Sequence, residues 1–171
     1  MCGFTAGRRR TPGGKQAKAP AAKFRIGTYD SRSVAIAFAG SAPFNQWMGD
    51  LKAEHEKARA SEDRKRVAEL EAEGAARQRL MHTQGFSTAP VTNILDQIKD
   101  KLPAIKAEAG VSGLVSKWDK DGLAQHKDAD FVEVTMALVD ALSPSERQRQ
   151  SAMDIQKHKP ISLEQAKGIR D

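Results

Sequence analysis

Cysteine is nearly absent from this sequence, and long apolar runs are missing altogether. The single cysteine, Cys2, excludes an internal disulfide framework and a zinc site built on cysteines. No run approaches the roughly 18 apolar residues that a membrane-spanning helix needs. Aromatic residues make up only 5% of the chain and hydrophobic residues 39%, against 29% charged residues. This composition predicts a small hydrophobic core and a large exposed helical surface.

Catalytic signatures are missing as well. The sequence contains no nucleophile elbow, no HExxH motif, no phosphate loop and no dinucleotide fingerprint. The four histidines are scattered, and the group formed by His126, Asp128 and Asp130 has the spacing of no established metal site. We therefore predict a protein that is not an enzyme and that needs neither a cofactor nor a metal.

The excess positive charge lies at the N-terminus. Residues 1–23 hold six arginines and lysines and no acid, while the rest of the chain balances 22 bases against 22 acids. We predict that residues 1–23 form a disordered basic tail, for which weak contact with anionic surfaces is the functional interpretation. A solvated tail without a partner is the alternative. No specific nucleic-acid partner is expected, because the remainder of the chain offers no basic face.

A long charged helical stretch, about residues 42–85, dominates the middle of the chain. Ser61 is expected to cap its second helix. A bend near residues 60–61 would fold the two helices into a hairpin arm of roughly 25–35 Å. The first helix carries one strong apolar stripe, and the second carries a narrow seam with the 3-4-7 spacing of a coiled coil. The stripe is formed by Trp47, Met48 and Leu51, and the seam by Val67, Leu70, Gly74 and Met81, interrupted by Arg77.

Short strands and helices flank this arm. The predicted elements are strands at residues 24–30, 113–118 and 131–135, and helices at residues 33–39, 90–109 and 134–142. Pro103 should kink the second of these helices, and Gly110 should end it. A polar connection is expected between the second and third strands. Ser143 is expected to cap a C-terminal helix reaching about residue 158, and Ser162 with Gln165 forms a second capping box near the surface.

Three segments resemble the OmpH/Skp-like periplasmic chaperones. FRIGTYDSRSV (residues 24–34) resembles the first strand and turn of that family. IKAEAGVSGLVSKWD (residues 105–119) is similar to its return from the hairpin into the second strand, and DADFVEVTMALVDAL (residues 128–142) to its closing strand and helix. The three segments make up 41 of the 171 residues, and the resemblance rests on their order and spacing together.

The resemblance implies a trimer in the periplasm or cell envelope. In that family, short strands from three subunits form a common body, and helical hairpins project from it to enclose an unfolded outer-membrane protein. No export signal is visible in this chain, so a cytoplasmic location stays open. Strands this short bury little core alone, which also favours a body shared between subunits. Its expected members are Ile26, Val115, Val132 and Val134.

The sequence as a whole predicts an α+β, predominantly helical fold. A charged helical hairpin, a short coiled coil, would project from a small three-stranded body shared in a trimer. The expected divisions are the tail 1–23, a chaperone-like domain 24–143 and a helical extension 144–171. The predicted function is an ATP-independent holdase that binds unfolded proteins, with Trp47, Met48 and Leu51 as the candidates for client contact. Packing of these three residues within the arm is the alternative reading, and a structural or adaptor protein of the cell envelope is the alternative function.

Overall fold

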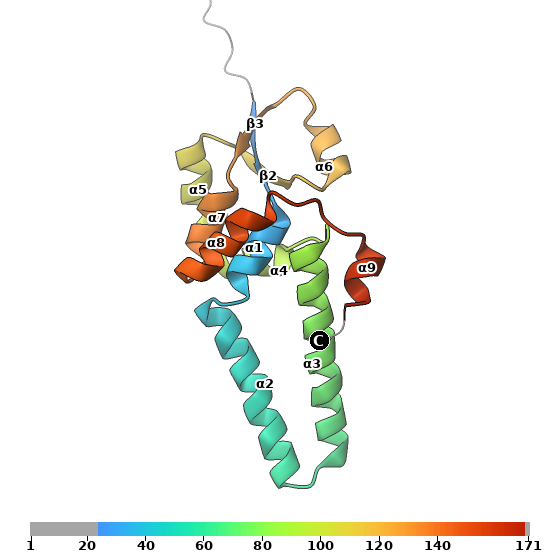
Figure 1. Ribbon diagram of the computed structural model, residues 1–171. Coiled ribbons are helices and arrows are strands. Elements are labelled where there is room, and N and C mark those ends of the chain that lie inside the picture. The colour runs from blue at the N-terminus through green and yellow to red at the C-terminus, as the bar shows by residue number, and fades with distance from the viewer. Residues whose placement is uncertain (1–23, 170–171) are drawn as a thin grey trace, which may run out of the picture.

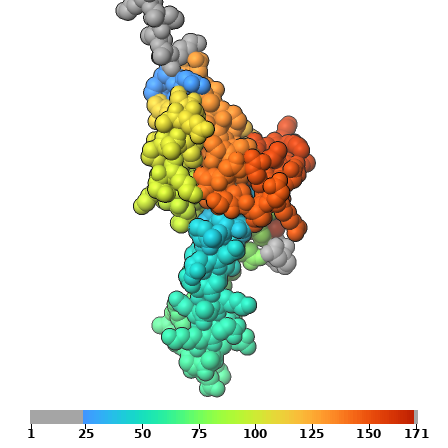
Figure 2. All heavy atoms as spheres, turned by 90° about the vertical axis from the view of Figure 1, so that its left-hand side faces the viewer, coloured from blue at the N-terminus to red at the C-terminus, as the bar shows by residue number. Residues whose placement is uncertain are grey.

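The computed structural model describes residues 24–169, and the predicted basic tail, residues 1–23, lies outside them. The chain forms a small body and an arm that extends from one side of it (Figure 1). The body combines a three-stranded sheet with short helices, and the arm consists of two long helices. A turned view shows the arm as a column of atoms narrower than the body (Figure 2). The prediction of a mostly helical α+β fold is thus confirmed.

The sheet is parallel throughout, with its first strand in the centre. The strands are β1 (Arg25–Tyr29), β2 (Gly113–Ser116) and β3 (Asp130–Glu133), in the order β2-β1-β3. Ile26 lies opposite Gly113 on one side and opposite Phe131 on the other. Parallel neighbours require long crossovers, so the arm and the helices after it connect β1 to β2. Gly27 is required by close packing, because a Cβ there would lie 2.8 Å from Leu114 Cδ2.

The hydrophobic core lies at the carboxyl end of the sheet. It is built from α1 (Ser31–Phe38), α7 (Thr135–Ala141) and α8 (Glu146–Ile155), which pack on one another. Asp30 caps α1 by accepting a hydrogen bond from the Arg32 backbone amide. Val34, Leu138 and Ala152 are fully buried in this cluster. The predicted helices at 33–39 and 134–142 are therefore confirmed, with small shifts in their ends.

The chain buries its own strands. Ile26, Val115 and Val134 are buried within one chain, and Val132 is half-buried against the core cluster. Three of the four residues expected in a shared body are thus covered without neighbouring subunits, because helices of the same chain pack on the strands. A trimer remains a prediction, and it no longer follows from the burial of the strands.

The arm comprises α2 (Ala42–Ala60) and α3 (Arg64–Phe86), which contact each other along their length. The two helices converge at their connecting turn and diverge toward the body (Figure 1). α2 begins with Ser41 as its cap and spans about 28 Å at 1.5 Å per residue. The predicted cap of α3 was wrong by two positions. Asp63, not Ser61, accepts from the Arg66 amide, and Ser61 ends α2.

The segment between the arm and β2 is broken into short pieces. It contains α4 (Thr92–Leu95), the 3-10 turn η1 (Asp96–Ile98) and α5 (Leu102–Ala109). The prediction of one kinked helix was wrong. Pro103 has no amide hydrogen and its ring would clash with an upstream carbonyl, so the chain restarts a helix there with Pro103 in the first turn. Gly110 ends α5 with φ of 64°, as predicted.

The polar connection between β2 and β3 contains a helix that the sequence analysis missed, α6 (Lys120–Gln125). Asp119 caps it by accepting a hydrogen bond from the Gly122 amide at 2.9 Å. The cap of α8 was also misplaced. Ser145 and Gln148 form its capping box, whereas Ser143 precedes it with φ of 53°. The box of Ser162 and Gln165 at the start of α9 (Leu163–Lys167) is confirmed.

The C-terminal segment packs on the rest of the molecule. The Ser33 hydroxyl donates to the Ala152 carbonyl at 2.7 Å, which ties α8 to α1. The Ile161 amide donates to the Phe86 carbonyl at 3.0 Å, and α9 then lies along α3 with Ala166 fully buried. Residues 146–169 are thus part of the folded unit and help to fix the upper end of α3, where the arm meets the body.

Candidate protein-binding site on the helical arm

The interior of the arm is narrow and only partly apolar. Leu70 is 2% exposed, and Leu51 Cδ2 lies 3.6 Å from the position that a Cβ on Gly74 would occupy. A Cβ at position 74 would make an ordinary van der Waals contact with Leu51, so the two helices pack at normal distance at this level. Val67 and Met81, the outer members of the predicted seam, are half-buried. The seam residues thus share one side of α3, and Leu51 lies in the arm's interior.

Ion pairs on the arm's outer faces join the two helices. Arg66 on α3 binds Glu54 on α2 and also Glu69 one turn along its own helix. The hydrogen bonds that Arg66 donates to Glu54 and Glu69 raise its pKa. His55 Nε2 lies 3.4 Å from Glu71 Oε1. These charged side chains are mostly exposed, so solvent screens their attraction, and they set the register of the helices more than the stability of the arm.

Trp47 is held where the two helices diverge. The guanidinium carbon of Arg77 stands 4.0 Å from the centre of the Trp47 ring, and Arg77 Nη1 donates to the Trp47 carbonyl at 2.7 Å. Glu73 binds the other end of the guanidinium. The arginine inside the predicted seam is therefore accommodated through a cation–π contact and a main-chain hydrogen bond. The ring of Phe44 contacts Trp47 edge-on, with 6.1 Å between centroids.

A cleft of about 270 Å³ opens at the root of the arm, and we call it the root cleft. Trp47 and Pro43 of α2 form its arm side, and Phe38 of α1, only 8% exposed, contributes from the body. Asn93 and Gln97 line it from α4 and η1. The lining residues therefore come from the arm, the core and the segment that follows the arm.

The structure separates the three residues predicted to contact a client. Only Trp47 lines the root cleft, while Leu51 packs in the arm's interior and Met48 is half-buried beside it. The other lining residues were not singled out from the sequence. Asn93 and Gln97 lie more than 40 positions after Trp47, and no local pattern places them next to it.

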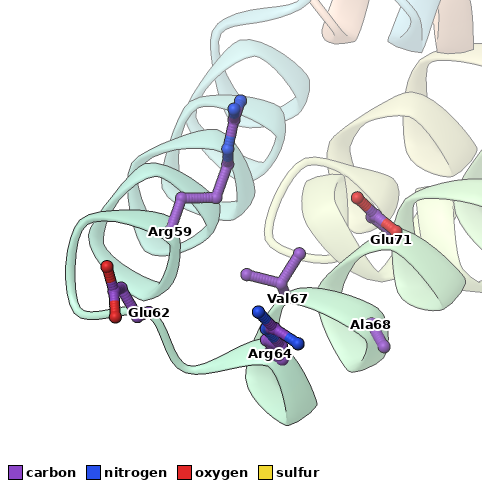
Figure 3. A pocket seen from close by; sticks show the side chains of 6 residues that line it. All are labelled: Arg59, Glu62, Arg64, Val67, Ala68 and Glu71. Carbon is purple, nitrogen blue, oxygen red and sulfur yellow. The ribbon is translucent and has the colours of Figure 1, made fainter.

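A second cleft, of about 440 Å³, lies at the tip of the arm (Figure 3). Its lining residues are Arg59, Glu62, Arg64, Val67, Ala68 and Glu71. Most of these side chains are long, charged and exposed. We place the candidate site at the smaller root cleft, because rigid aromatic walls hold a ligand at a lower entropic cost than mobile charged side chains do.

The most deeply buried charges lie at the carboxyl end of the sheet. Arg32 and Asp30 are 0% and 2% exposed and form a two-point ion pair, at 3.1 and 2.7 Å. Trp118 Nε1 also donates to Asp30, and Arg32 Nη1 donates to the His158 carbonyl at 2.9 Å. Burial alone would raise the pKa of Asp30, but the hydrogen bonds from Arg32 and Trp118 and the charge of Arg32 lower it below its ordinary value.

A second ionised group stands beside this pair. Burial acts to raise the pKa of Glu133, but its bonds to Lys117 and Thr135 bring it below the ordinary value. The Thr135 hydroxyl in turn accepts from the Asp30 amide at 2.8 Å. Every ionic group named here is paired inside the network, so its chemistry is that of a structural brace rather than of a reacting centre. The sequence analysis did not identify these residues as a cluster.

Residues 24–169 hold neither a metal-binding cluster nor a membrane-spanning helix. No three histidine, cysteine, aspartate or glutamate side chains in this range gather to hold a metal ion. No helix in the described part of the chain is long and apolar enough to cross a membrane. Comparison with protein-family models, curated proteins and solved structures yields no match to the chain.

Proposed function

We propose that this chain is an ATP-independent holdase that binds unfolded proteins through its helical arm. The observation that carries the proposal is the root cleft, an aromatic hollow at the base of a helical pair that extends from the body. A half-exposed tryptophan ring with exposed polar side chains at the rim suits weak binding of many apolar segments. Weak, distributed contacts also allow release without an energy source.

The charged faces of the arm support the same function. They keep the arm soluble, while Trp47 and Phe44 lie at its root, where α2 and α3 diverge (Figure 1). A client segment at the root would lie beside the body and between charged walls.

For the assembly, we propose a homotrimer whose arms surround one client, located in the periplasm or cell envelope. The support is the resemblance to the OmpH/Skp-like chaperones in three segments, together with the order of strand, helical arm, strands and helix. We likewise propose that α2 and α3 act as a short antiparallel coiled coil around Leu70 and Leu51. Exposed Phe131 on the edge strand β3 offers apolar surface for contact between subunits.

One contact favours a second function, a structural or adaptor protein of the cell envelope without chaperone activity. Trp47 is already covered on one face by Arg77 and approached by Phe44 on its edge. If these contacts use the whole ring, the aromatic group serves to stiffen the arm and not to bind a client.

An aggregation assay separates the two functions. An outer-membrane β-barrel protein is diluted from urea into buffer without ATP, and light scattering is followed with increasing amounts of this chain. We expect suppression at stoichiometric ratio, weakened by Trp47→Ala and unaffected by Phe24→Ala, which removes an exposed aromatic ring that does not line the root cleft. Absence of suppression at every ratio would favour the adaptor.

A further inference from the structure

The root cleft carries no charge, although 29% of the residues in this chain are charged. Its five lining residues are two aromatic residues, one proline and two carboxamides. A charged side chain that enters it would lose part of its hydration without gaining an ion-pair partner. No lining side chain can supply that partner. The cleft therefore disfavours acidic and basic side chains.

The size of the cleft limits what can enter it. Pockets that hold small molecules or cofactors usually measure about 300–1,000 Å³. A volume of about 270 Å³ lies below that range and suits one large side chain with a short piece of main chain. Three aromatic rings follow one another at this place. The ring centroids of Phe38 and Phe44 are 5.6 Å apart, and those of Phe44 and Trp47 are 6.1 Å apart. A further ring can join such an edge-to-face series.

The two carboxamides match the chemistry of a peptide group. Asn93 is fixed in orientation because its Oδ1 accepts from Gln84 Nε2 at 2.6 Å, while Gln84 also donates to the Pro90 carbonyl. The amide hydrogens of Asn93 are then left to face a ligand. Gln97 is exposed, and no hydrogen bond holds its side chain among residues 24–169. Together they offer donors and an acceptor, which is what an extended main chain needs.

We propose that the root cleft binds one aromatic or large aliphatic side chain of an extended, uncharged peptide segment, whose main chain is bonded by Asn93 and Gln97. This inference rests on the proposed function and names the sequences that the arm selects. Gln97 is the positioning residue that can be changed with least effect on folding, because its side chain is exposed.

The test measures fluorescence anisotropy with the full chain and labelled blocked peptides. One peptide is Gly-Ser-Phe-Ser-Gly, and its matched partner has glutamate in place of the phenylalanine. We expect the phenylalanine peptide to bind at least tenfold more tightly. Gln97→Ala should weaken that binding roughly two- to tenfold, the loss expected for one hydrogen bond. Gln150→Ala, an exposed glutamine on α8, serves as the matched control and should leave it unchanged.

Two results would overturn the inference: equal affinity for both peptides, or identical losses for the Gln97 and Gln150 variants. A third variant, Gln97→Glu, adds a negative charge at the rim without shortening the side chain. We expect that this variant does not bind the glutamate peptide. We also expect that it binds a peptide with aspartates beside the phenylalanine more weakly than the native chain does. If the full chain suppresses aggregation but shows no such selectivity, the inference fails and the holdase function stands. If suppression fails as well, the proposed function fails with it.

Discussion

Replacing Arg32 with alanine removes the charge that neutralises the buried carboxylate of Asp30. The lost interactions are the two bonds to Asp30, the bond to the His158 carbonyl and the stacking on Trp118, whose ring centre is 4.9 Å from the guanidinium. Breaking a buried ion pair by removing one partner costs about 3–5 kcal/mol, because the remaining charge is left without compensation. Domains of this size are stable by about 5–15 kcal/mol, so the loss is a large fraction of the total.

The assay is urea unfolding followed by far-UV circular dichroism, at one protein concentration for all variants. The matched control is Arg149→Ala, because Arg149 also binds an aspartate, Asp140, at two points, 2.7 and 3.1 Å. That pair is 38% and 49% exposed, so its removal should shift the midpoint far less. For Arg32→Ala we expect a much lower urea concentration at the midpoint of unfolding. The dependence of the free energy of unfolding on urea concentration should change little.

The pH dependence gives a second test of the same reasoning. In the native protein the pKa of Asp30 is below its unfolded value, so the carboxylate contributes stability above pH of about 4, which is lost as the pH falls through the native pKa. Without Arg32, burial should raise this pKa above the unfolded value. The difference in free energy of unfolding between the variant and the native protein should then become smaller as the pH falls. A loss no larger than that of Arg149→Ala, or one independent of pH, would refute the role assigned to the pair.

Three further predictions concern the arm, α8 and the assembly. Glu62 has φ of 59° in the turn at the arm's tip, so Glu62→Asn should raise the free energy of unfolding by about 0.5–1 kcal/mol, and a decrease would contradict the strain assigned there. Ser145→Ala removes the cap of α8 and should lower that free energy by about 1 kcal/mol, whereas Ser143→Ala should leave the helix capped. Light scattering should give a native mass near three times the chain mass of 18.6 kDa, and a monomer would contradict the trimer.

Local signals in the sequence predicted much of the element order. Three local patterns each fix the backbone within a few residues, and each prediction is confirmed. They are the alternation of side chains at residues 24–30, Gly110 at a helix end, and the capping box of Ser162 and Gln165. Caps with competing candidates were less certain. At the tip of the arm both Ser61 and Asp63 can cap a helix, and only the geometry of the turn shows that Asp63 does so.

Long-range pairing could not be predicted in the same way. The parallel order with β1 in the centre depends on which strands meet after long crossovers, and the strand patterns do not encode this. Arginine is seldom fully buried, so nothing marked Arg32 as a core residue. Its bonds run to Asp30, two positions away, and to His158, 126 positions away. The same holds for the candidate site. Trp47 could be singled out from the sequence because it is a tryptophan in a charged helix, whereas Gln97 is recognised only from its position in the fold.

Hydrogen–deuterium exchange with and without an unfolded outer-membrane β-barrel protein tests most directly whether the root of the arm is the binding surface. The proposed function predicts slower exchange on client addition in α2 near Trp47 and in the segment with Asn93 and Gln97. It predicts little change at the tip around Glu62 or in α8. Unchanged exchange at the arm root in a complex that does form, with protection elsewhere on the chain, would contradict the account.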